Sequence, residues 1–103
     1  MVALQISKKY EQAEEILERF IRTHPEHLLA HQLSIDLYKI MRERAKEHAI
    51  TAQYLALQGR FREASQEMGS ALVYTRSKLD QARYSARIEH YKKQDLRLKS
   101  LQE

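Results

Sequence analysis

Three histidines in the first third of the chain are, by residue type and spacing, the side chains best suited to do chemistry. His24, His27 and His31 follow one another at intervals of three and four residues, which places His27 and His31 on one helix face. Such a pair could ligate zinc, but a hydrolytic site needs a third ligand and a glutamate directly after the first histidine. Leu28 stands in that position. We therefore predict solvated histidines at a helix start, with no metal and no other cofactor.

Other catalytic patterns are also missing from the sequence. No serine lies in a Gly-x-Ser-x-Gly turn, no glycine-rich phosphate loop is present, and the chain contains no cysteine. We expect no enzymatic activity from this chain itself.

The composition favours one helical domain over residues 1–103. Hydrophobic residues make up 43% and charged residues 31%, while there are only two glycines and one proline. So few turn formers cannot supply the tight turns of a sandwich or barrel. No apolar run approaches the ~18 residues that would predict a membrane-spanning helix. Residues 1–5 also lack the charged and apolar regions of a signal peptide.

Apolar residues recur at intervals of three and four, which predicts amphipathic helices. Pro25 and Gly59 mark two helix ends, and we expect a further break near Arg42, although neither glycine nor proline occurs there and one continuous helix remains possible. Short connections between helices imply antiparallel neighbours. We base the predicted core on the apolar stripes of the helices. The first helix contributes Ile16 and Phe20, the second contributes Leu29, Leu33 and Ile40, the third and fourth contribute their alanines, and the last contributes Leu79. The predicted helices lie near residues 10–23, 27–41, 44–58, 61–74 and 77–99.

Two segments, residues 10–20 and 61–71, are similar to each other. Each begins with an aromatic residue, has alanine three positions later, and continues with large apolar residues. This pattern resembles the second half of a tetratricopeptide repeat (TPR), in which a small alanine lets paired helices approach closely. Pro25 and Gly59 also fall where such repeats place their proline and turn glycine.

The TPR resemblance implies a TPR-like stack of about five antiparallel helices, an α-solenoid fragment. Residues 1–7 are too few to form the helix that should precede Tyr10 in a complete repeat. The chain is therefore expected to be the C-terminal end of a longer repeat array.

A narrower resemblance comes from the second half of the chain. Gln-Tyr-Leu-Ala-Leu-Gln-Gly-Arg-Phe at residues 53–61 is followed by Gln-Ala-Arg-Tyr-Ser-Ala-Arg-Ile at residues 81–88. These segments look like the C-terminal tail of bacterial periplasmic zinc metalloproteases that carry TPR repeats, of the beta-barrel-assembly-enhancing type. The resemblance implies a periplasmic location, a role in outer-membrane protein quality control, and a tail that binds protein substrates or partners.

The net charge of +4 resides entirely in the last helix. Residues 1–75 contain ten basic and ten acidic side chains, whereas residues 76–103 contain eight basic and four acidic ones. The basic residues are distributed around the predicted helix, which favours a solvated face. Binding of an acidic protein, or of nucleic acid or lipid, remains an alternative.

The sequence thus predicts a protein-binding module in which stacked helix pairs leave a concave face for a peptide or partner helix. The candidate groove residues lie off the apolar stripes of the middle helices, and they are Gln32, Asp36, Lys39, Lys46 and Gln53. One alternative is a homodimerisation element that pairs through an exposed terminal helix face. A basic helical nucleic-acid-binding domain is a third possibility. As partner we expect a protein or peptide, with no nucleic acid and no membrane insertion.

Overall fold

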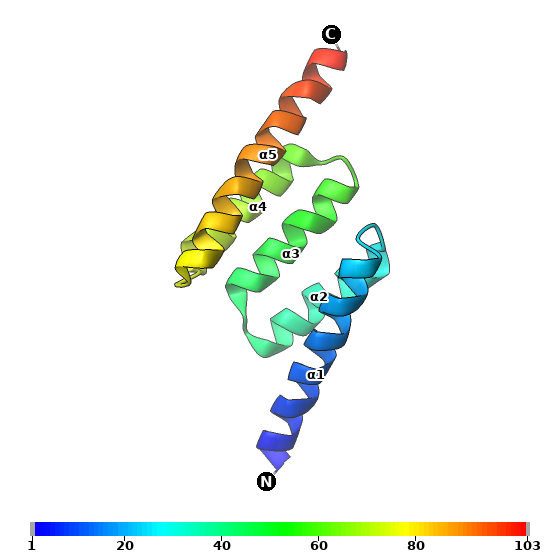
Figure 1. The fold of residues 1–103 in the computed structure, drawn as a ribbon, viewed down its shortest axis with the longest axis vertical. Coiled ribbons are helices and arrows are strands. Elements are labelled where there is room, and N and C mark those ends of the chain that lie inside the picture. The colour runs from blue at the N-terminus through cyan, green and yellow to red at the C-terminus, as the bar shows by residue number, and fades with distance from the viewer. Residues whose placement is uncertain (1, 103) are drawn as a thin grey trace.

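Five helices make up nearly all of the computed structural model, which describes the backbone of residues 2–102 and the side chains of residues 6–102. Successive helices run in opposite directions, so that α1 begins and α5 ends at opposite ends of a molecule measuring 59 × 27 × 19 Å (Figure 1). The prediction of an all-α stack of antiparallel helices is confirmed. The helices are α1 (Val2–Thr23), α2 (Leu28–Met41), α3 (Arg44–Leu57), α4 (Phe61–Tyr74) and α5 (Lys78–Gln102).

The helices form two layers. Each helix packs mainly against its neighbours in sequence, because turns of two to four residues leave no room for another arrangement. In Figure 1, α1 crosses in front of α2 and α5 lies in front of α4. The similar segments 10–20 and 61–71 therefore fall in different layers, the first on α1 and the second on α4. They do not occupy equivalent positions in the stack.

Alanines and one methionine form the main core between α3, α4 and α5. Small side chains on facing helices permit a close approach, and two tyrosine rings from α5 fill the space that remains. The ring of Phe61 lies 6.3 Å from that of Tyr91, measured between centroids. The buried residues of this core are Ala49, Ala52, Ala64, Met68, Ala71, Tyr84 and Tyr91.

A second buried group lies on α2 and includes two polar residues. His31 is only 1% exposed, and its Nδ1 lies 2.8 Å from the carbonyl oxygen of His27, to which it donates. The Ser34 hydroxyl donates to the Ala30 carbonyl at 2.9 Å. The prediction of solvated histidines is therefore wrong for His31, because its polar atom is satisfied within its own helix and the ring can be buried.

The first helix begins earlier than predicted, at Val2 instead of near residue 10. Ile6 falls four residues before Tyr10, so the apolar period continues toward the N-terminus. The last helix extends to Gln102 instead of residue 99, since neither glycine nor proline interrupts it. The other boundaries agree to within one residue.

Several apolar residues assigned to the core by their spacing are instead exposed to solvent. Helix α1 packs mainly against α2 alone, and α2 packs mainly against α1 and α3, so part of each predicted apolar stripe has nothing to pack against. The same holds near the start of α5. These exposed residues are Ile16, Phe20, Leu29, Leu33, Ile40 and Leu79.

Two left-handed residues terminate helices in this fold. Arg42 follows α2 with φ 59°, and its backbone N–H donates to the carbonyl of Lys39 at 3.2 Å. Gly59 follows α3 with φ 78°, as expected for a glycine that ends a helix. The chain therefore breaks between α2 and α3 at Arg42, although an arginine is strained in this conformation.

Substituting Arg42→Gly should stabilise the fold by about 0.5–1 kcal/mol, because glycine adopts positive φ without a Cβ penalty. Gly59→Ala should cost about 1 kcal/mol by the same argument, since no atom lies within 4 Å of the added Cβ and only backbone strain changes. Urea unfolding measures both. If the free energy of unfolding changed in the same direction in both variants, the left-handed backbone assigned to Arg42 and Gly59 would be contradicted.

Candidate functional site

The three histidines stay close together near the start of α2, but each makes a structural contact of its own. The His24 ring stacks on Phe20 at a centroid distance of 4.5 Å. His27 caps α2, with its Nδ1 accepting a hydrogen bond from the N–H of Ala30 at 3.1 Å. His31 is buried, as described above. Among the described residues, no three His, Cys, Asp or Glu side chains are placed together to hold a metal ion.

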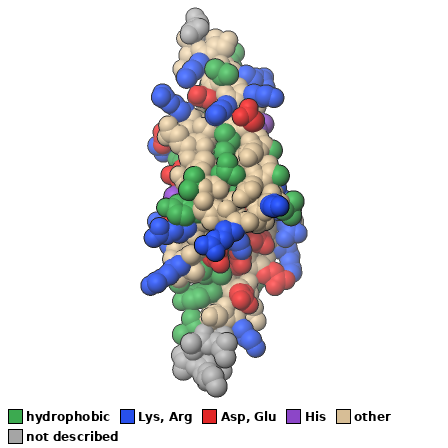
Figure 2. Space-filling view, turned by 90° about the vertical axis from the view of Figure 1, so that its left-hand side faces the viewer, with side chains coloured by type: hydrophobic (Ala, Val, Ile, Leu, Met, Phe, Trp, Pro, Cys, Tyr) green, Lys and Arg blue, Asp and Glu red, His purple; other side chains and the backbone are tan. Residues whose placement is uncertain are grey.

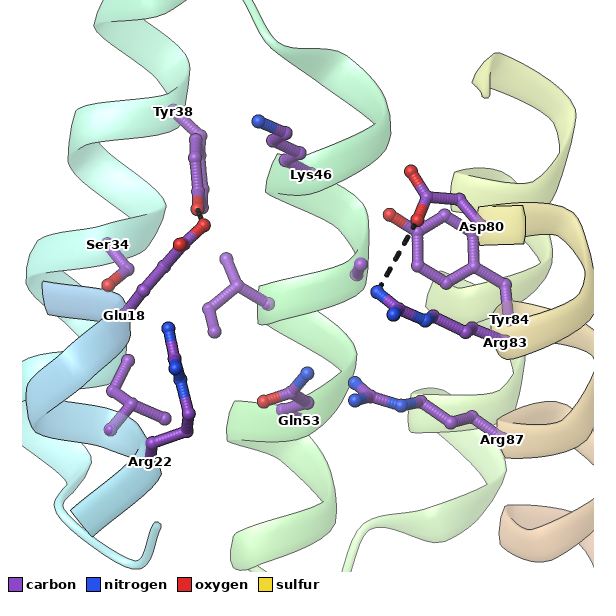
Figure 3. A pocket seen from close by; sticks show the side chains of 13 residues that line it. Glu18, Arg22, Ser34, Tyr38, Lys46, Gln53, Asp80, Arg83, Tyr84 and Arg87 are labelled. Atoms are coloured by element: carbon purple, nitrogen blue, oxygen red, sulfur yellow. Dashed lines mark hydrogen bonds and ion pairs between the residues drawn. The ribbon is translucent and has the colours of Figure 1, made fainter. Parts of the chain in front are cut away.

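The principal concave site is a hollow of about 650 Å³ between α1, α3 and α5. Helix α3 forms its floor, while α1 and α5 form opposite walls (Figure 3). Tyr38 and Ser34 reach it from α2, and α4 contributes nothing. The hollow therefore exists because α1 and α5 stand apart on either side of α3, and each is joined to α3 mainly through the helix between them, α2 or α4.

The side chains that line the hollow are mostly polar or charged. From α1 come Glu18, Ile21 and Arg22, and from α3 come Lys46, Ala49, Ile50 and Gln53; α5 provides Asp80, Arg83, Tyr84 and Arg87. Four of these residues are cationic and two are anionic. By contrast, cationic and anionic side chains are interspersed over the side of the molecule drawn in Figure 2.

A polar cluster joins the first three helices at one end of the hollow. Lys46 Nζ lies 2.9 Å from Oε2 of Glu14, and the ammonium is 5.9 Å from the centroid of the Tyr38 ring. The Tyr38 hydroxyl donates to Oε1 of Glu18 at 3.5 Å. No residue of α1 is fully buried among those described. Ionic and polar contacts therefore contribute substantially to holding α1 on the stack.

Burial and nearby charge shift the titration of this cluster. Burial, with the charges of Glu14 and Glu18, raises the pKa of Tyr38 well above its usual range. Burial alone would lower the pKa of Lys46, but the hydrogen bond and charge of Glu14 outweigh it, so the pKa is raised. Burial also raises the pKa values of Tyr84 and Tyr91.

These shifts predict a steep loss of stability at alkaline pH. Above about pH 10 the unfolded chain releases phenol and ammonium protons that the folded chain keeps, so the free energy of unfolding falls as pH rises. Below that pH the contribution is fully present. Thermal unfolding as a function of pH, with tyrosinate absorbance, measures the effect. In the Tyr84→Phe/Tyr91→Phe variant the free energy of unfolding should fall less steeply with pH. A fall as steep as in the wild type would show that these two tyrosines are not its cause.

The candidate groove residues do not all lie at one site. Lys46 and Gln53 line the main hollow. Gln32 and Asp36 line a second, smaller depression beside Tyr54, where the Gln32 amide donates to the Tyr54 hydroxyl at 3.1 Å. Lys39 is exposed and lines neither hollow. Helix α2 presents Ser34 and Tyr38 to the main hollow, whereas Gln32 and Asp36 lie on another part of its surface, beside Tyr54 of α3.

Sequence reasoning missed the arginines of the walls. Arg22, Arg83 and Arg87 line the hollow together with Lys46. The excess of basic residues in the last helix pointed to the two α5 arginines. That they line the same hollow as Arg22 of α1 depends on how distant segments of the chain pack. No local pattern encodes that packing.

No family model matches this chain, and a search of curated proteins finds no match. Within residues 2–102, no helix combines the length and the hydrophobicity that crossing a bilayer would require.

Proposed function

We propose that this chain is a non-catalytic protein-interaction module that binds an extended segment of a partner protein in the hollow between α1, α3 and α5. The observation that carries the proposal is the hollow itself, which has a volume of about 650 Å³. Pockets of roughly 300–1,000 Å³ with a few convergent polar groups are typical ligand sites.

The lining chemistry supports a peptide as the ligand. The Gln53 amide on the floor can both donate to and accept from a peptide backbone, while the two tyrosines elsewhere in the lining carry polar hydroxyls on apolar rings. Both walls of the hollow are helices, and a groove between helices is a surface on which an extended segment can lie.

The resemblance of residues 53–61 and 81–88 to the tails of periplasmic TPR-containing zinc metalloproteases supports a more specific proposal. In that setting the module would bind substrates or partners for a protease acting in outer-membrane protein quality control. This part of the proposal depends on the sequence resemblance alone.

Selection from a library of random linear peptides, displayed on phage and panned against the full chain, tests the proposed function. Enriched peptides should shift NMR signals of residues that line the hollow. Gln53→Trp would fill the floor and should abolish their binding, whereas Gln66→Trp, on the exposed surface of α4, should not. Absence of enrichment, or signals that map elsewhere, would contradict the proposal.

A second candidate function, homodimerisation, is supported by the exposed apolar face of α2. Leu29, Leu33 and Ile40 recur at intervals of four and seven residues and are 49–58% exposed. Exposed apolar groups that share a helix face favour pairing with another such face. Sedimentation over a concentration series should then show a dimer that Leu33→Asp returns to monomer. A persistent wild-type monomer would exclude this candidate.

A further inference from the structure

The charges in the hollow are unevenly compensated. Lys46 is paired with Glu14 at 2.9 Å, and Arg83 with Asp80 at 4.0 Å. Glu18 accepts the Tyr38 hydroxyl. Among the side chains of residues 6–102, neither Arg22 nor Arg87 has an ion-pair partner. Among the described side chains, the charged lining residues without an ion-pair partner are therefore these two arginines and the carboxylate of Glu18, which leaves a net positive charge.

These two arginines extend from opposite walls of the hollow. Arg22 comes from α1 and Arg87 from α5, and Gln53 of the floor lies between them in Figure 3. The carboxylates Glu18 and Asp80 lie toward the other end of the hollow in the same view. The site therefore has a polarity, with a mixed end near Tyr38 and a cationic end around Gln53.

We propose that the cationic end, formed by Arg22, Gln53 and Arg87, is a subsite for acidic side chains of the partner segment. This inference rests on the proposed function, since it identifies what the bound segment must carry. A guanidinium presents parallel N–H groups that match a carboxylate in a bidentate pair. The Gln53 amide between the arginines can hydrogen bond the adjoining peptide group.

An acidic polypeptide fits this site better than a nucleic acid does. A phosphate backbone requires a continuous cationic track, but Glu18 and Asp80 interrupt the hollow, and the surface in Figure 2 has mixed charge. A peptide can place an acidic residue between the arginines and neutral residues at the end that holds the two carboxylates.

The experiment repeats the random-peptide selection with three proteins and then measures binding of the enriched peptides by fluorescence anisotropy. The proteins are the wild type, the Arg22→Gln/Arg87→Gln variant, and the control Arg62→Gln/Arg97→Gln. The control removes the same charge from exposed positions outside the hollow. Arginine and glutamine have similar helix propensities, and thermal unfolding verifies that all three proteins are folded.

Wild type and control should enrich peptides containing Asp or Glu, and Gln-for-Glu or Asn-for-Asp versions should bind roughly 10- to 100-fold more weakly. The Arg22→Gln/Arg87→Gln variant should lose this preference, and the wild-type affinity should fall as salt increases. Peptides that bind the hollow without an acidic preference would overturn the subsite and leave the proposed function intact. Failure to enrich any peptide would overturn both. Displacement of an acidic peptide by a single-stranded oligonucleotide of equal affinity would assign the arginines to phosphate instead.

Discussion

Replacing Met68 with alanine should lower the free energy of unfolding by about 2–5 kcal/mol. The Met68 side chain is fully buried, and the other buried members of its core cluster on α3 and α4 are alanines. Alanines have no side-chain freedom with which to fill the space, so the truncation leaves a cavity. A domain of this size has a total stability of roughly 5–15 kcal/mol, so the variant should approach the limit of folding.

Urea unfolding followed by circular dichroism measures this effect. Val73→Ala on the same helix is the matched control, because Val73 is 80% exposed and its truncation should change stability by less than about 0.5 kcal/mol. Similar losses for the two variants would show that α4 does not present Met68 to the core.

Replacing Lys46 with methionine should loosen α1 from the rest of the stack. The substitution keeps the length of the side chain but leaves the Glu14 carboxylate, 15% exposed, without its partner. Because Lys46 itself is 42% exposed, solvent screening limits the expected cost to about 1–2 kcal/mol. The loss should be local, since α1 contributes no fully buried side chain among those described.

Hydrogen exchange measures this release helix by helix. Amides of α1 should exchange about 5- to 30-fold faster, while those of α4 should keep their wild-type rates. Lys39→Met removes an exposed lysine and serves as the control, and the charge swap Glu14→Lys/Lys46→Glu should restore part of the protection. Uniform acceleration across all five helices would contradict the local role of the pair.

The hollow links this second prediction to function. Since α1 forms one wall and provides Arg22, loosening it should weaken binding of any segment held there. Lys46 is therefore a poor choice for testing direct partner contact, because its substitution alters the wall as well as the lining. Arg87 and Gln53 are better probes, as neither forms an ion pair among the described side chains that holds a helix in place.

Local signals in the sequence predicted the helices well. Gly59 and Pro25 stand at helix ends because their backbone preferences act wherever they occur in a chain. The break at Arg42 was expected only because a helical stack has to reverse direction, since arginine has no such preference. The apolar period could not decide which stripes become core, and Leu33 and Ile40 remained exposed for want of a neighbouring helix.

The site was only partly predictable. Lys46 and Gln53 lie in the hollow, while Gln32 and Asp36 of the preceding helix face a different depression. Residues off an apolar stripe face away from the core of their helix, but the placement of the neighbouring helices decides which depression they line.

By itself the amino-acid sequence determined five helices, their antiparallel order and a chain whose excess positive charge lies near its C-terminus. These properties follow from short-range preferences and from the length of the turns. Only the tertiary structure decided that α1 and α5 stand on either side of α3, that His31 is buried, and that Arg22 and Arg87 face one hollow from opposite walls. Such pairings join residues far apart in sequence, and they depend on how side chains of several helices fill space together.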